Sequence, residues 1–159
     1  MRAIHNIPPV WDERSRVLIL GSFPSVRSRE ERFFYAHPQN RFWSVLAAVF
    51  AAPVPETVTQ KRVFLLSHRV ALWDVAAACE ITGSADTTMS GVIPNDLAPI
   101  LSGAPIERIY TNGKTAHALF DRFVFPATGR EATCLPSTSP ANAAWSLKDL
   151  IGAWRAVAE

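Results

Sequence analysis

Four short apolar runs in this chain alternate with longer stretches in which apolar residues recur at every third or fourth position. Each run is bounded by polar residues or glycine, which is typical of buried strands. The runs are 17–20, 70–75, 108–111 and 132–135. Strands that alternate with helices favour a parallel sheet covered by helices. The pattern therefore predicts an α/β fold, a three-layer α/β/α sandwich around a central, mostly parallel sheet of four strands.

The stretches between these runs predict the helices. After Asn40, which is favourable at a helix start, apolar residues recur at helical spacing through 41–51. Further helices are expected at 56–68, in a short segment opened by Pro94, at 114–123 and at 146–158. No repeat or linker interrupts the pattern, so residues 1–159 are expected to form one domain.

Composition narrows the class of protein only slightly. The 16 Lys and Arg exceed the 14 Asp and Glu by +2, so the net charge neither requires nor excludes nucleic acid. Cys79 and Cys134 are too few for a zinc or iron–sulfur cluster, and we expect no metal or cofactor. The first residues lack a signal core, and no apolar run approaches the roughly 20 residues of a membrane span. A soluble, cytoplasmic protein is expected.

Polar residues collect where the predicted strands end. They include Ser22 and Ser25 after the first run, Asp74, Ser84 and Asp86 after the second, Asn112 and Lys114 after the third, and Ser137, Thr138 and Ser139 after the fourth. Loops at the carboxyl ends of parallel strands share one edge of the sheet, where open α/β folds bind ligands. We expect these residues to line one cleft.

Residues 35–43, Tyr-Ala-His-Pro-Gln-Asn-Arg-Phe-Trp, bring a stacking ring, hydrogen-bonding groups and an aromatic anchor together and predict a pocket wall. This block and four others resemble the hypoxanthine-DNA (deoxyinosine) glycosylases of the uracil-DNA glycosylase superfamily. The other blocks are GSFPS at 21–25, LWDVAAACEITGSAD at 72–86, NGKTA at 112–116 and LPSTSPANA at 135–143. The resemblance spans about residues 17 to 155. It implies a uracil-DNA glycosylase-like fold and a monofunctional enzyme that flips a deaminated base out of DNA and hydrolyses its N-glycosidic bond.

The residues suit that chemistry on physical grounds. An extruded base needs a π-face in place of its lost neighbours, and Tyr35 can supply one. Asn40 is the candidate catalytic residue, because its amide carbonyl oxygen could hold the attacking water while its NH₂ group donates elsewhere. Asn40 could instead cap the helix that follows it. The resemblance also points to Asn40.

One position departs from the family pattern. Related glycosylases often carry Asn or Asp immediately before the proline of the first loop, whereas this chain has Phe23. Phe23 cannot activate water, which favours Asn40 as the catalytic group. Ser22 and Phe23 are expected to line the base pocket, with burial in the core as the alternative for Phe23.

The remaining candidates each have a structural alternative. Asn112 is expected to bind the edge of the base or to cap a helix. Ser25, Lys114 and the Ser137–Ser139 loop are expected to contact DNA, although Lys114 could face solvent and the loop could be an ordinary rigid turn. His37 is more often a structural hydrogen-bonding residue in such a position, and Asp74 and Ser84 are weaker candidates on the same rim.

The leading hypothesis is a glycosylase that acts on DNA containing deoxyinosine, with deoxyuridine and deoxyxanthosine as further candidate substrates. A monomer without an obligate protein partner is expected. Two alternatives stay open: a hydrolase of free nucleosides or nucleotides, for which the GSFPS loop is a poor phosphate loop, and an inactive nucleic-acid-binding domain of the same fold.

Overall fold

The central sheet has the four strands that the apolar runs predict. A computed structural model describes residues 2–81 and 89–159. Its main sheet has the order β3-β2-β6-β7, and every neighbouring pair is parallel. The strands are β2 (Val17–Gly21), β3 (Val70–Asp74), β6 (Arg108–Asn112) and β7 (Thr133–Leu135). The predicted four-stranded parallel sheet is confirmed.

The register of this sheet aligns the strand ends from which the candidate site is built. Gly21 at the end of β2 lies opposite Asp74 at the end of β3. On the other side, Asn112 at the end of β6 lies opposite Leu135 at the end of β7. The loops that follow all four strands therefore leave from the same edge of the sheet.

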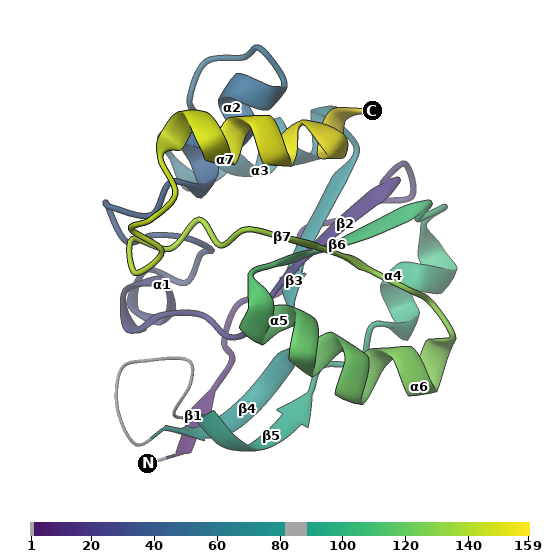
Figure 1. Cartoon of the computed structure of the whole chain (residues 1–159). Helices are drawn as coiled ribbons and strands as arrows, with labels where there is room; N and C mark the ends of the chain where they lie inside the picture. The colour runs from purple at the N-terminus through teal and green to yellow at the C-terminus, as the bar shows by residue number, and fades with distance from the viewer. Residues whose placement is uncertain (1, 82–88) are drawn as a thin grey trace.

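Helices cover both faces of the sheet, as Figure 1 shows. One face carries α2 (Phe42–Val49), α3 (Val58–Ser67) and α7 (Leu147–Trp154), which continues into the short helix η3 (Arg155–Ala158); the other carries α4 (Ala98–Gly103), α5 (Lys114–Leu119), η2 (Phe120–Val124) and α6 (Phe125–Thr128). Alternate residues of β2 pack on opposite sides, with Ile19 in one apolar cluster and Leu18 in the other. The three-layer sandwich is confirmed.

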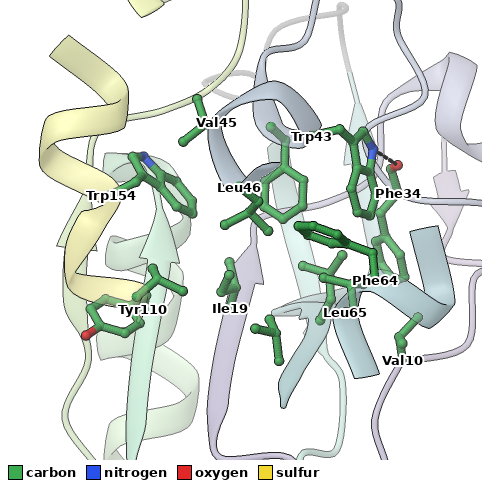
Figure 2. Close-up of a cluster of buried hydrophobic side chains, with 14 of the residues drawn as sticks. Val10, Ile19, Phe34, Trp43, Val45, Leu46, Phe64, Leu65, Tyr110 and Trp154 are labelled. Carbon is green, nitrogen blue, oxygen red and sulfur yellow. Dashed lines mark hydrogen bonds between the residues drawn. The ribbon is translucent and has the colours of Figure 1, made fainter. Parts of the chain in front are cut away.

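The larger apolar cluster also fixes loops near the candidate site. Figure 2 shows Leu46, Phe64 and Trp154 packed over the sheet beside Ile19. The indole N–H of Trp154 donates to the carbonyl oxygen of Pro136 at 2.9 Å. In the same way the indole of Trp43 donates to the carbonyl oxygen of Phe34 at 3.3 Å. Two buried tryptophans thus tie the segments that start at Phe34 and at Pro136 to the helices.

A second, antiparallel sheet was not predicted. It has the order β1-β4-β5, with β1 at Arg2–Ile4, β4 at Ala76–Ile81 and β5 at Met89–Pro94. Only Val75 separates β3 from β4, so one extended segment passes from the parallel sheet into the antiparallel one.

One helix prediction changes at this point, and one helix is added. Pro94 ends β5, and the short helix expected to begin there starts only at Ala98. The structure adds α1 (Val26–Glu31), a short and mostly exposed helix that the pattern did not predict. Within the described residues, no helix combines the length and apolarity needed to cross a membrane.

Candidate active site

Three polar side chains from separate segments of the chain meet at the carboxyl edge of the parallel sheet. Asn40 precedes α2, Asn112 ends β6, and Thr138 follows β7. The hydroxyl of Thr138 donates to Asn40 Oδ1 at 2.9 Å and accepts from Asn112 Nδ2 at 3.0 Å. The backbone N–H of Thr138 also donates to Asn112 Oδ1 at 3.0 Å. Thr138 therefore joins the two amides, and its own side chain is fully buried.

The carbonyl oxygen of Asn40 is already used by the fold. Besides the Thr138 hydroxyl, it accepts the backbone N–H of Phe42 at 2.9 Å, at the first residue of α2. An amide oxygen has two lone pairs, and both have donors here. The expected contact between this oxygen and a water molecule does not fit that arrangement. Among the residues that the structure describes, none accepts a hydrogen bond from Asn40 Nδ2, so the NH₂ group is the part of the amide left for a ligand.

Arg41 fixes the loop that carries Thr138. Its guanidinium donates to the carbonyl oxygens of Ser139 at 3.3 Å, of Asn142 at 3.1 Å and of Trp145. Its backbone N–H donates to the carbonyl oxygen of Thr138 at 3.1 Å. A planar guanidinium suits this task because it presents five N–H donors in a rigid fork.

Gly113 allows the loop after β6 to approach the loop after β7. Its φ is +96°, and a Cβ at this position would lie 3.0 Å from Ser137 Cβ. Its N–H donates to the carbonyl oxygen of Leu135 at 2.8 Å. The glycine is thus required both by its backbone conformation and by the close contact, which holds Asn112 beside Thr138.

Tyr35 lies over the end of β2. Its backbone is in the left-handed region at φ +52°, and its ring stacks on Phe42 with centroids 4.0 Å apart and planes 20° from parallel. A Cβ on Gly21 would lie 2.9 Å from Tyr35 Oη and 2.3 Å from Asp74 Oδ1. The tyrosine hydroxyl and the carboxylate therefore both occupy the space that the missing side chain of Gly21 leaves.

Asp74 is paired with His5, a residue that the sequence analysis did not select. His5 Nε2 lies 2.9 Å from Asp74 Oδ2, and the two side chains are 3% and 5% exposed. The backbone N–H of Ile7 donates to His5 Nδ1 at 3.1 Å, so Nδ1 acts as acceptor and Nε2 carries the proton given to Asp74. His5 follows β1, and the pair therefore links the antiparallel sheet to the end of β3.

The first loop is more buried than expected. Phe23 is 8% exposed and packs with Ala3, Ala76 and Cys79 in a small apolar cluster against the antiparallel sheet. This position fits the alternative in which Phe23 belongs to the core. Ser22 is also buried. The hydroxyl of Ser25 accepts the backbone N–H of Ser28 at 3.1 Å and so caps α1.

The predicted DNA-binding residues divide into buried and exposed groups. Thr138 requires a correction, because a fully buried side chain whose hydroxyl already has two partners cannot contact a DNA strand. Ser137 and Ser139 remain partly exposed, and Ser137 Oγ accepts the N–H of Ser139 at 3.1 Å. His37 is exposed, and its Nδ1 accepts the N–H of Gln39 at 3.1 Å, which is a local structural role.

Lys114 borders a groove beside the candidate site. The groove has a volume of about 480 Å³ and runs between β5 and the α5–η2 helix. Lys114 and Arg122 are exposed on its helical side, and Ser90 and Gly91 lie on its strand side. Lys114 and Thr115, which line one side of the groove, follow Asn112 and Gly113 directly in the sequence. Ser84 and Asp86, the other rim candidates, lie outside the described residues.

Comparisons with known proteins agree with this geometry. The family model described as "Uracil DNA glycosylase superfamily" matches residues 8–158. The chain belongs to the uracil DNA glycosylase superfamily. Among curated members, the proteins named "Hypoxanthine DNA glycosylase" from Methanosarcina acetivorans and Methanosarcina barkeri are each 32% identical to it, over 154 and 151 residues. These alignments cover 96% and 94% of both chains, respectively.

A solved structure of a superfamily member has the same fold. It is a solution NMR structure of a candidate uracil DNA glycosylase from Methanosarcina acetivorans, with a TM-score of 0.82, 28% identity and full coverage of both chains. Together with the named relatives, it supports a DNA glycosylase activity for this superfamily member.

Three residues that build the site of this superfamily member were not predicted from its sequence. They are Arg41, His5 and Asn142. Arg41 and His5 bind partners that are far away along the chain. The Asn142 Nδ2 binds loop backbone, because it donates to the carbonyl oxygen of Ser137 at 2.9 Å. Arg41 had one usable signal, its place next to Asn40. The buried pairing of His5 had none, because the region before the first apolar run gives no periodic pattern.

Proposed function

We propose that this protein is a monofunctional DNA glycosylase that removes hypoxanthine from DNA containing deoxyinosine. The observation that carries the proposal is the meeting of two amides, Asn40 and Asn112, on Thr138 at the carboxyl edge of the sheet. The near-full-length similarity to relatives named "Hypoxanthine DNA glycosylase" supports the choice of base.

The proposed reaction is hydrolysis of the bond between the base and C1′ of the sugar. The target nucleotide leaves the duplex, and its base lies against Tyr35 on the side of the ring opposite Phe42. As the bond breaks, its electron pair moves to the base and positive charge develops on the sugar. A water oxygen then bonds to C1′, and the water proton goes to the base, leaving an abasic site. Hydrogen-bond donors that face the base favour this charge separation.

Asn112 is held in a single orientation by Thr138. Its Oδ1 accepts from the Thr138 backbone and its Nδ2 donates to the Thr138 hydroxyl, so the amide cannot turn over without losing both bonds. Because both bonds go to one residue, they use the side of the amide on which the oxygen and the N–H lie together, and the remaining lone pair and N–H point apart. The remaining N–H can donate one hydrogen bond to a carbonyl oxygen of the base. Each deaminated base has a carbonyl oxygen where its parent base has an amino group, so such a donor favours hypoxanthine over adenine.

Single-lesion oligonucleotides test the proposal. Duplexes that carry one deoxyinosine, deoxyuridine or deoxyxanthosine are incubated with the protein, and abasic sites are then cleaved with alkali. We expect strand scission with deoxyinosine and none with deoxyadenosine at the same position. Turnover of free nucleosides without scission of DNA would favour a nucleoside hydrolase, and DNA binding without any scission would favour an inactive binding domain.

A further inference from the structure

We infer that Thr138 is a positioning residue that holds Asn40 as a hydrogen-bond donor, so that Asn40 acts on the departing base through its NH₂ group and does not hold the attacking water through its carbonyl oxygen. The inference rests on the proposed function. The acting atom of Asn40 is then its side-chain nitrogen. The buried hydroxyl of Thr138 contacts neither DNA nor base, and its role is to orient that nitrogen.

The direction of each hydrogen bond follows from its donors. The backbone N–H of Phe42 can only donate, so the Asn40 atom 2.9 Å away is the carbonyl oxygen. The hydroxyl of Thr138 has a single proton. Because it accepts from Asn112 Nδ2 at 3.0 Å, that proton is directed to Asn40 Oδ1 at 2.9 Å. The backbone N–H of Thr138 fixes Asn112 in turn, through Oδ1. These bonds run in one direction, from Asn112 through Thr138 to Asn40.

This direction strengthens Asn40 as a donor. An amide whose oxygen accepts two hydrogen bonds is polarised, and its N–H groups become more positive. The base gains negative charge as the N-glycosidic bond breaks, so such a donor stabilises the transition state more than the bound substrate. Thr138 is fully buried and its loop is held by Arg41, so the hydroxyl has little freedom to turn away.

Replacing Asn40 by Asp distinguishes a donor to the departing base from a residue that holds the attacking water. An aspartate at this position keeps an oxygen for Phe42 N–H and for Thr138, so the start of α2 and the hydrogen bonds that run from Asn112 through Thr138 to residue 40 stay in place. It exchanges the NH₂ group for a second acceptor. If Asn40 acts as donor, Asn40→Asp and Asn40→Ala should each lower kcat on deoxyinosine DNA by about 100- to 1000-fold. If the variant keeps wild-type turnover, the donor role is wrong.

Two substitutions test Thr138 itself. Thr138→Val keeps the shape and removes the hydroxyl, and we expect kcat to fall about tenfold or more with little change in KM. Thr138→Ser restores the hydroxyl and should recover kcat to within about threefold of wild type. Thr128→Val is the matched control, because the Thr128 hydroxyl donates to the carbonyl oxygen of Val124 at 2.8 Å in a helix away from the site. Wild-type kcat in Thr138→Val, or no recovery in folded Thr138→Ser, would overturn the role.

A measurement without substrate keeps this inference separate from the proposed function. In ¹⁵N NMR spectra of the free protein, the side-chain NH₂ resonances of Asn40 and Asn112 should shift in Thr138→Val and return in Thr138→Ser, while those of Asn142 stay in place. Unchanged Asn40 and Asn112 resonances in Thr138→Val would show that the Thr138 hydroxyl does not hold the two amides. A wild-type protein that cleaves none of the lesion duplexes would refute the glycosylase proposal, and the NMR result would still decide whether Thr138 fixes the two amides.

Discussion

Gly21 is the residue at which one methyl group should disturb the site most. In Gly21→Ala, the new Cβ would lie 2.3 Å from Asp74 Oδ1 and 2.9 Å from Tyr35 Oη. Tyr35 or Asp74 must move, and overpacking of this kind costs about 2 kcal/mol. We expect a lower free energy of unfolding, measured by urea denaturation, together with weaker turnover of deoxyinosine DNA.

The matched control is Gly152→Ala in α7. A Cβ there meets nothing within 4 Å, and alanine is the better helix former. This variant should gain about 0.5–1 kcal/mol of stability and keep its activity. Equal stability losses in both variants would show that the crowding over Gly21 is not the cause.

The position of a single residue could be predicted from the sequence where its neighbours along the chain determine it. Asn40 was selected for its amide and from the family resemblance, with a bond to the start of the following helix as the alternative, and its oxygen does accept the N–H of Phe42. Phe23 was given core burial as an alternative, and that alternative fits the structure. Thr138 was assigned to DNA because hydroxyls in a Pro-rich loop look exposed in sequence. Its burial depends on Asn40 and Arg41, which lie about a hundred residues earlier in the chain.

At the scale of elements, the loop between β7 and α7 depends on Arg41. Arg41→Lys keeps the charge but loses the fork that reaches the carbonyl oxygens of Ser139, Asn142 and Trp145. We expect the backbone amides of Asn142 and Trp145 to exchange hydrogen at least about tenfold faster, because the bonds to the guanidinium hold their turn in place. Hydrogen exchange followed by NMR measures this directly.

Arg27→Lys provides the comparison. The Arg27 guanidinium pairs with Glu31 at 3.2 Å on the exposed surface of α1, where ion pairs contribute little. Exchange in the β7–α7 loop should stay at the wild-type rate in this variant. A loop that exchanges equally slowly in Arg41→Lys would show that other contacts hold it.

The elements themselves were predicted unevenly, for physical reasons. The buried strands β2 and β3 are rich in Val, Leu and Ile, and their hydrophobicity is enough to identify them. The strand β4 reads Ala-Ala-Ala-Cys-Glu-Ile, which has little strand propensity of its own and forms because β1 and β5 pair with it. The helix α1 is short and exposed, so it leaves no apolar stripe in the sequence.

At the scale of the molecule, the buried pair His5–Asp74 joins the two sheets. His5→Ala would leave the Asp74 carboxylate buried without its 2.9 Å partner. We expect a loss of about 3 kcal/mol in the free energy of unfolding. Asp74→Asn in the same background should recover part of it, because a neutral amide is less costly to bury than an unpaired carboxylate. Urea denaturation of the four combinations gives the coupling energy, and a value near zero would contradict the link.

The groove between β5 and α5–η2 offers a surface for the DNA backbone. If Lys114 and Arg122 each neutralise a phosphate, Lys114→Ala and Arg122→Ala should each reduce the slope of log K against log salt by about 0.7–0.9. Binding of lesion duplexes at several salt concentrations measures the slope. Arg16→Ala is the control, because Arg16 precedes β2 at the opposite edge of the sheet. Slopes unchanged in both groove variants would place the phosphates elsewhere.

The hydrogen bond between Thr138 and Asn40 spans 98 residues of sequence, and the bond from Arg41 to Trp145 spans 104. During synthesis, a nascent chain that has reached Leu135 already contains Asn40, Asn112 and all four strands of the parallel sheet. It lacks the hydroxyl that joins the two amides and the loop that Arg41 holds. The order of translation therefore delays assembly of the site until the segment from Pro136 to Trp145 has been made. A polypeptide released at Leu135 should fold in part but leave DNA intact.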